Sequence, residues 1–177
     1  PKVSLTNGSV QGFELLLRWN SPEYGLISPN EFIPIAETSG MVVPIGMWAM
    51  EQACRQLAAW HAQYPEMDDI TIAVNVSMRQ LLQTSFFTQV RDILESTGVV
   101  PNMLELELTE TSAMANPLQT MENLSMLKKL GLRLALDDFG TGYSSLAYLQ
   151  KLPIDILKID KAFVRGLGMN QSDMEII

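Results

Sequence analysis

The sequence predicts an α/β fold in which a parallel sheet is curved into a (β/α) barrel. Short apolar runs typical of buried strands recur at residues 70–76, 103–108, 132–137 and 154–160. Each run is separated from the next by helix signals, and this alternation implies right-handed βαβ crossovers between parallel strands. Polar residues stand near the carboxyl ends of successive runs, which is where barrels of this kind place their functional groups.

An antiparallel ribbon is expected to open the chain. Asn7-Gly8 separates residues 2–5 from a run that begins at Val10. Both turn residues tolerate positive φ, as a two-residue hairpin turn requires. The second arm is expected to continue to Trp19. It is almost wholly apolar, which is typical of a strand buried on both faces.

Two helices are expected before the first parallel strand. Residues 28–31 spell an S-x-x-E capping box with Pro29 at the first helical position, and Gly40 closes this short helix. Pro44 starts a longer helix, whose apolar residues recur at spacings of three and four as far as Trp60. This stripe is interpreted as core.

The distribution of polar residues favours a barrel over an open, doubly wound sheet. These residues are spread over successive strands, as Glu14, Asn75, Glu107, Asp137 with Asp138, and Lys158. An open sheet instead concentrates its ligand groups at one switch point. The sequence also lacks the G-x-G-x-x-G and G-x-x-x-x-G-K-[ST] loops that bind nucleotide phosphates. A barrel is therefore the expected architecture.

We expect the barrel to be incomplete in this chain. Fewer strands can be counted than the eight that closure requires. A helix signal over 144–152 precedes the last strand, and residues 172–175 spell another capping box shortly before Ile177. Residues 1–177 are therefore expected to form a single domain, a (β/α)8 TIM-like barrel with an antiparallel first strand. The start of that strand and the last two βα units are expected to be missing.

Composition and charge exclude several classes of function. The 177 residues carry 12 Lys and Arg against 20 Asp and Glu, a formal net charge of −8. This charge repels polyanions, so we expect no binding of DNA or RNA polymers. Cys54 is the only cysteine, which excludes a cysteine-rich zinc site, and His61 is the only histidine. We interpret Cys54 as a small buried hydrophobe and His61 as a helix-end contact, so catalytic chemistry must rest mainly on carboxylates.

The sequence also carries an expectation about location. No apolar run approaches the roughly 20 residues that a membrane-spanning helix needs. Residues 1–6 show no apolar segment or cleavage site of a signal peptide. We expect a cytoplasmic setting, which includes the cytoplasmic domain of a membrane-anchored protein.

The polar residues at the strand ends are suited to divalent cations. Several carboxylates at one end of a barrel repel one another and resist burial, and cations relieve both costs. All candidate ligands are oxygen donors, which favours Mg²⁺ or Mn²⁺ over zinc. Asp137 can bridge two ions while Asp138 faces the second, and Lys158 can orient a water or stabilise phosphate charge. Glu105 is interpreted as facing away from this site.

Several motifs resemble the EAL-domain family of cyclic di-GMP phosphodiesterases. They span nearly the whole chain, and the strand motifs are about 30 residues apart, the length of a βα unit. The motifs are Gly12-Phe13-Glu14-Leu15-Leu16-Leu17-Arg18-Trp19, Phe32-Ile33-Pro34-Ile35-Ala36-Glu37, Val74-Asn75-Val76-Ser77, Glu107-Leu108-Thr109-Glu110, residues 137–146 (DDFGTGYSSL) and Leu157-Lys158-Ile159-Asp160.

The resemblance implies a single EAL domain over residues 1–177. It implies an eight-stranded barrel that binds two Mg²⁺ or Mn²⁺ ions and hydrolyses cyclic di-GMP to linear pGpG, which lowers the level of this bacterial second messenger. The family often forms homodimers. Sensory or cyclase domains are expected elsewhere in the full protein.

The resemblance also implies roles for individual residues. The first metal would be held by Glu14, Asn75, Glu107 and Asp137, and the second by Asp137 and Asp138. Lys158 would position the attacking water and is counted with Glu14 as catalytic. Arg18 would contact a substrate phosphate, and Glu110 would anchor the loop over 138–145.

Other interpretations stay open at this point. Glu14 can form a structural ion pair with Arg18 on the same strand, Asp137-Asp138 can be turn residues, and Lys158 can pair with Asp160 or a barrel carboxylate. Leu15 stands where the family usually has alanine. The alternative function is a catalytically inactive receptor for cyclic di-GMP, and a purely structural or interaction domain is the third.

Overall fold

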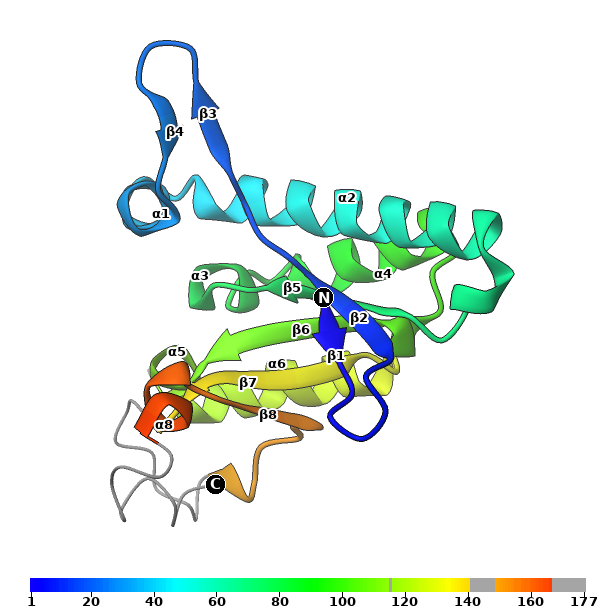
Figure 1. Ribbon diagram of the computed structural model, residues 1–177. Coiled ribbons are helices and arrows are strands. Elements are labelled where there is room, and N and C mark those ends of the chain that lie inside the picture. Colours follow the sequence, from blue (N-terminus) through cyan, green and yellow to red (C-terminus); the bar gives the residue numbers. More distant parts are fainter. Residues whose placement is uncertain (115, 141–148, 167–177) are drawn as a thin grey trace.

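A six-stranded curved sheet forms the centre of the molecule (Figure 1). The computed structural model describes residues 1–114, 116–140 and 149–166. The strands lie in the order β1-β2-β5-β6-β7-β8. Their bounds are Lys2–Val3 (β1), Val10–Leu15 (β2), Thr71–Asn75 (β5), Leu104–Thr109 (β6), Arg133–Phe139 (β7) and Ile156–Ile159 (β8).

The pairing of the strands confirms the predicted α/β class and the antiparallel first strand. β1 is antiparallel to β2, and every later pair in this sheet is parallel. Helices follow the parallel strands and lie along one face of the sheet (Figure 1). The molecule is therefore an α/β protein with a parallel sheet and an antiparallel first strand. Closure into eight strands stays a prediction.

The helices agree with most of the sequence signals. They are Pro29–Ser39 (α1), Val42–Gln63 (α2), Met78–Leu81 (α3), Phe86–Thr97 (α4), Glu110–Met114 (α5), Pro117–Lys129 (α6) and Lys161–Gly166 (α8), with 3-10 turns at Pro65–Met67 (η1) and Pro101–Met103 (η2). Ser28 caps α1 by accepting a hydrogen bond from the backbone of Asn30, and Gly40 ends it at φ 80°. The signal at 172–175 and most of that at 144–152 lie outside the described residues.

Helix α2 begins two residues before the predicted start. Pro44 is in its first turn, where its missing N–H has no helical partner to lose. Among the described residues no single helix is long and apolar enough to span a bilayer. Together α1 and α2 reach that length, but a bend of 120° separates them.

A second hairpin replaces the continuous strand expected between Val10 and Trp19. β2 ends at Leu15, and the chain then forms β3 (Trp19–Ser21), which pairs with β4 (Gly25–Ile27) in a ribbon that projects from the body (Figure 1). In the turn between β3 and β4, the Ser21 hydroxyl accepts hydrogen bonds from the backbone N–H groups of Glu23 and Tyr24, and Gly25 has φ 69°. These turn residues redirect the chain.

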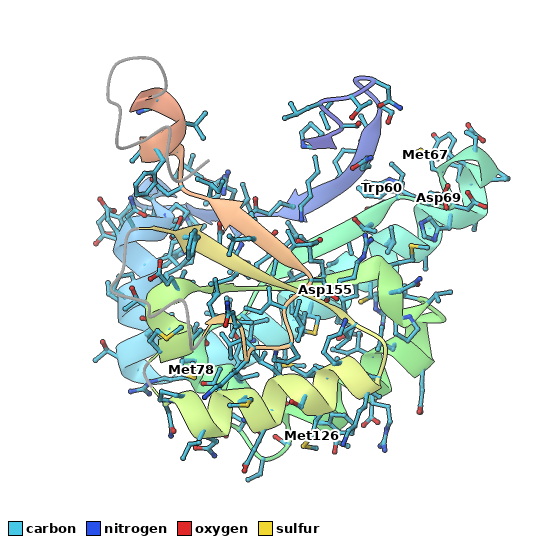
Figure 2. The ribbon with its side chains drawn as sticks, turned by 90° about the horizontal axis from the view of Figure 1, so that it is seen from below. Trp60, Met67, Asp69, Met78, Met126 and Asp155 are labelled. Atoms are coloured by element: carbon cyan, nitrogen blue, oxygen red, sulfur yellow. The ribbon has the colours of Figure 1, made fainter. Side chains whose placement is uncertain are left out.

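The expectation that this run is buried on both faces is wrong. In β2 only Gly12 is fully buried, while Phe13, Glu14 and Leu15 are half-buried. The described part of the sheet places only the two residues of β1 beyond β2, so little chain covers that edge. Phe13 instead packs against Trp60 of α2, which Figure 2 labels, and the ring centroids are 5.1 Å apart.

The hydrophobic core fills the space between the sheet and the helices. Its largest fully buried side chains come from α2, α3, α6 and the central strands, and they include Met50, Leu57, Leu81, Leu106, Leu124, Leu127 and Leu134. Cys54 belongs to this core, and burial raises the pKa of its thiol to about 12. His61 lies in the last turn of α2, and its Nε2 is 3.0 Å from the carbonyl oxygen of Ile70. This is the helix-end contact that the sequence predicted.

Candidate metal centre

Strand register places Glu14, Asn75 and Glu107 on one face of the sheet. Asn75 of β5 is paired with Glu107 of β6, so their side chains are neighbours. Glu14 of β2 is paired with Ala73, which lies two residues before Asn75. Because alternate residues of a strand share a face, the three polar side chains project together.

The register of the last strands adds a carboxylate and a cation to the same face. Asp137 of β7 is paired with Thr109, two residues beyond the glutamate of β6. The register between β7 and β8 shifts after the pair Leu136–Leu157, and Lys158 of β8 contacts Asp137 at this shift. Five strands therefore contribute to one cluster near their carboxyl ends.

The carboxylates of this cluster are close enough to share an ion. One oxygen each from Glu14, Glu107 and Asp137 lies within 4.8 Å of the other two. In this structure the shared cation is the ammonium of Lys158. Its Nζ lies 2.5 Å from Glu107 Oε2, 2.9 Å from Asp137 Oδ2 and 3.7 Å from Glu14 Oε2.

Asn75 orients the outermost carboxylate. Its Nδ2 donates a hydrogen bond of 2.9 Å to Glu14 Oε1. The alternative interpretation of Glu14, an ion pair with Arg18, is not found among the described residues. The Arg18 side chain is exposed and donates instead to the carbonyl of Leu17 at 2.8 Å.

Glu107 is the electrostatic centre of the site. Its side chain has no exposed surface and lies between two ammonium groups, those of Lys158 and Lys2. Burial alone would raise the pKa of Glu107, but hydrogen bonds from the two lysines outweigh burial and hold the pKa below its ordinary value. Burial likewise acts to lower the pKa of Lys158, and the bonds to Glu107 and Asp137 reverse that effect and raise it. Both groups are therefore charged at neutral pH.

The interpretation of Glu105 as facing away from the site is wrong. Residues 105 and 107 are two apart on β6 and so lie on the same face. Glu105 is 1% exposed, and its Oε1 lies 2.5 Å from the ammonium of Lys2, which also donates to Glu107 Oε1 at 3.0 Å. Because side chains alternate between the two faces of a strand, the sequence alone could have placed Glu105 on the same face as Glu107. No sequence signal pointed to Lys2.

Asp138 lies in a crowded acidic corner beside the cluster. Its φ of 54° is unusual for a residue with a side chain, and its backbone N–H donates to Asp137 Oδ1 at 2.9 Å. Burial, followed by the nearby carboxylates of Asp137 and Asp160, raises the pKa of Asp138. A second cation would relieve this repulsion.

Glu110 supports the segment that follows β7. It is 1% exposed, and its Oε2 accepts a 2.8 Å hydrogen bond from the backbone of Gly140. The remainder of the predicted loop, from residue 141 onward, lies outside the described residues. Gly140 has φ 97° and packs against the Phe163 ring of α8.

A cleft opens beside the cluster. It has a volume of about 470 Å³ and reaches from Asn75 and Glu107 to α1 and α2. Leu15, Ile33 and Val42 contribute apolar walls. Ligand pockets commonly enclose roughly 300–1,000 Å³ and combine such walls with a few polar groups.

The donor set fits a hard divalent cation. The converging groups are carboxylates and an amide, with neither imidazole nor thiolate among them. Lys158 and Lys2 partly offset the repulsion between the carboxylates in this structure, and a divalent cation would offset it further. The arrangement is that of a metal site beside a partly apolar cleft.

Comparisons with known proteins agree with this geometry. The EAL domain family matches residues 1–177. The chain is 43% identical over 176 residues to the cyclic di-GMP phosphodiesterase NbdA of Pseudomonas aeruginosa, covering 99% of this chain and 22% of the relative. It is 41% identical over 181 residues to the bifunctional diguanylate cyclase/cyclic di-GMP phosphodiesterase MucR of the same species, covering 100% of this chain and 26% of the relative.

Solved structures give the same result. The PaMucR phosphodiesterase in complex with c-di-GMP superimposes with a TM-score of 0.92 at 41% identity, over 99% of this chain and 70% of that chain. The cAMP-bound EAL enzyme Bd1971 superimposes with a TM-score of 0.90 at 37% identity, over 98% of this chain and 49% of that chain. The chain thus spans about a quarter of the curated relatives it matches.

Proposed function

Because this chain belongs to the EAL domain family, we propose that it forms the catalytic part of a metal-dependent phosphodiesterase that converts cyclic di-GMP to linear pGpG. The observation that carries the proposal is the convergence of Glu14, Glu107 and Asp137 around Lys158. This combination suits a metal-dependent phosphodiesterase, because anionic ligands hold cations and a lysine can interact with phosphate.

Two Mg²⁺ or Mn²⁺ ions are the proposed cofactors. The first would be held by Glu14, Asn75, Glu107 and Asp137. The second would be held by Asp137 and Asp138, which is consistent with the raised pKa of Asp138. When bound, these ions supply a nucleophile at neutral pH and screen the charge of the phosphodiester.

Lys158 acts in this proposal as a donor. Its pKa is raised, so the ammonium keeps its proton at neutral pH and cannot serve as a general base. A protonated lysine can hold the oxygen of an attacking water or of a phosphate by donating to it. Asn75 holds Glu14 in place by the hydrogen bond from its amide.

The cleft supplies the remaining contacts to substrate. Leu15, Ile33 and Val42 can pack against the faces of a purine base, while Arg18 at its rim can reach a phosphate. The exposed Arg18 side chain has no carboxylate partner among the described residues, which leaves its guanidinium available for this role.

The wider organisation is part of the proposal. Residues 1–177 are assigned to one EAL domain that further βα units complete as an eight-stranded barrel. We also propose a homodimer, a cytoplasmic setting and additional sensory or cyclase domains. The small share of the multidomain relatives that the chain covers supports the last of these.

An inactive receptor for cyclic di-GMP is the second candidate. Leu15 favours it, because its larger side chain lines the cleft at the position where the family usually has alanine. A receptor would bind the nucleotide without turnover. Binding and hydrolysis therefore have to be measured separately.

The deciding experiment measures pGpG formation by the full-length protein with Mn²⁺, with Mg²⁺ and with EDTA. Metal-dependent product that is lost in Glu14→Gln supports the phosphodiesterase. Asp155, labelled in Figure 2, lies just before β8 and pairs with Lys128 instead of the cluster. Asp155→Asn therefore serves as the matched carboxylate control and should retain activity. Binding of cyclic di-GMP without product would favour the receptor.

A further inference from the structure

Lys2 makes a contact that the metal ligands alone do not explain. Its ammonium bridges two buried carboxylates, with distances of 2.5 Å to Glu105 Oε1 and 3.0 Å to Glu107 Oε1. The Glu105 and Glu107 side chains are 2% and 0% exposed, whereas the Lys2 side chain is 28% exposed. Lys2 therefore bonds to the oxygen of Glu107 that does not contact Lys158, and it links Glu105 to that oxygen.

The contact depends on the curl of the sheet. β1 and β6 are separated by β2 and β5, a separation of about 14 Å in a flat sheet at 4.7–4.9 Å per strand. Lys2 instead reaches across the concave face and bonds to residues more than 100 positions away in the sequence. A lysine placed in this way is held between two defined carboxylate oxygens.

We propose that Lys2 and Glu105 are a positioning pair for Glu107, in which Lys2 fixes Oε1 of Glu107 while Glu105 cancels the charge of Lys2. This inference rests on the proposed metal-dependent function. Neither residue touches the substrate or the reacting atoms. Both act through the glutamate that would bind the metal.

The two oxygens of Glu107 have different partners, which explains why Lys2 matters. Oε1 accepts from Lys2, and Oε2 faces Lys158 and the rest of the cluster. A bond to one oxygen restricts the rotation of a carboxylate and so limits the directions in which the other oxygen can point. Such fixation behind the ligating group is how supporting residues tune metal sites.

Glu105 is needed because an unbalanced lysine would oppose metal binding. A positive charge a few ångströms from a metal ligand repels a divalent cation. With Glu105 present, Lys2 and Glu105 together contribute no net charge. The Lys2 bond to Glu107 is then retained without a penalty in metal affinity.

The test uses the full-length protein with Glu105→Gln, Lys2→Met, the double variant and Lys2→Arg. Three quantities are measured for each: the Mn²⁺ concentration for half-maximal hydrolysis, kcat with KM for cyclic di-GMP, and the rise in Tm on replacing EDTA with Mn²⁺. The last quantity reports metal binding without turnover. Each variant is compared with itself in EDTA, so loss of stability alone does not change it.

We expect Glu105→Gln to raise the half-activating Mn²⁺ concentration at least about tenfold and to reduce the Mn²⁺-induced rise in Tm. Lys2→Met removes a positive charge, so its Mn²⁺ requirement does not increase, while kcat falls about tenfold because Glu107 is no longer fixed. The double variant should recover the Mn²⁺ requirement to within about threefold but keep the low kcat. Lys2→Arg should restore most of kcat.

A matched ion pair away from the cluster provides the control. Lys128 Nζ lies 2.7 Å from Asp155 Oδ1, and Asp155 immediately precedes β8 (Figure 2). Asp155→Asn should lower Tm without changing the response to Mn²⁺. An unchanged Mn²⁺ requirement in Glu105→Gln, or an equal increase in Asp155→Asn, would overturn the proposal. So would an unchanged kcat in Lys2→Met.

The outcomes separate this inference from the proposed function. A wild-type protein that forms no pGpG contradicts the phosphodiesterase, while the Mn²⁺-induced rise in Tm still tests the positioning pair. A wild-type protein that is active, with Glu105→Gln and Lys2→Met indistinguishable from it, contradicts the positioning pair alone.

Discussion

The ammonium of Lys158 lies 2.5 Å from Oε2 of Glu107, a carboxylate with no exposed surface. The same ammonium lies 2.9 Å from Asp137 Oδ2, so one lysine bonds to the two most enclosed carboxylates of the cluster. A buried carboxylate group without a cation is costly. The lysine therefore stabilises the metal-free site as well as carrying the catalytic role proposed for it.

Replacing Lys158 should separate these two effects. In Lys158→Met the carboxylates lose their shared cation, so we expect a lower Tm in EDTA and a larger stabilisation by Mn²⁺ than in the wild type. We expect kcat to fall at least about 100-fold, because no donor is left to orient the nucleophile. Steady-state kinetics and thermal unfolding measure both effects. Activity within threefold of the wild type would contradict the assigned role.

Two substitutions of Asn75 should change the Mn²⁺-induced rise in Tm in opposite directions. Its amide donates to Glu14 Oε1 at 2.9 Å. Asn75→Asp replaces this bond by a repulsion between two carboxylates, so we expect Tm in EDTA to fall by about 2–4 °C, the shift that corresponds to about 1 kcal/mol. Because the new carboxylate also attracts a cation, we expect the Mn²⁺-induced rise in Tm to increase. Asn75→Leu removes the oxygen donor and should reduce that rise. Equal responses to Mn²⁺ in the two variants would show that Asn75 is not near the ion.

Glu110 should affect activity through the backbone that it holds. Its buried carboxylate accepts from the N–H of Gly140, two residues beyond Asp138. Glu110→Ala leaves that N–H without this acceptor, and we expect kcat/KM to fall about tenfold or more. Glu110→Gln keeps an acceptor oxygen and should lose less. Glu122→Ala on the exposed face of α6 is the control and should match the wild type.

Asp155 gives a prediction about stability and pH. Burial acts to raise its pKa, but the bonds from Lys128 and from the backbone of Leu134 outweigh burial and hold the pKa below 3.8. A carboxyl group whose pKa is lower in the folded protein than in the unfolded chain stabilises the fold at pH values above the unfolded-state pKa. This stabilisation is lost as the pH falls through the folded-state pKa.

We therefore expect Asp155→Asn to cost about 1 kcal/mol near pH 7, a modest value because the pair is partly exposed. The difference from the wild type should shrink below about pH 4. Urea unfolding at pH 7 and at pH 3 measures it. A difference that is the same at both pH values would exclude the ion pair as its cause.

The sequence was informative where function follows local pattern. Alternating apolar runs identified the parallel strands, and the polar residues at their ends identified Glu14, Asn75, Glu107, Asp137 and Lys158 as neighbours. This succeeded because parallel strands bring their carboxyl ends to one edge, whatever the details of packing. Register then fixes which side chains share a face.

Two features were missed for different physical reasons. The ribbon of β3 and β4 was hidden because residues 10–19 are mostly apolar and look like one strand, while the turn between β3 and β4 depends on Ser21 and Gly25, which lie beyond that run. The Lys2 contact was hidden because it joins strands that are not neighbours and exists only when the sheet curls. Contacts that depend on curvature cannot be derived from strand patterns alone.

The most direct test of the metal centre is anomalous diffraction from crystals of the full-length protein grown with Mn²⁺. The site described here predicts an anomalous peak between the carboxylates of Glu14, Glu107 and Asp137, at distances of about 2.0–2.3 Å from their oxygens. No peak at this position at saturating Mn²⁺, with Lys158 still bonded to Glu107 and Asp137, would contradict a metal-dependent centre.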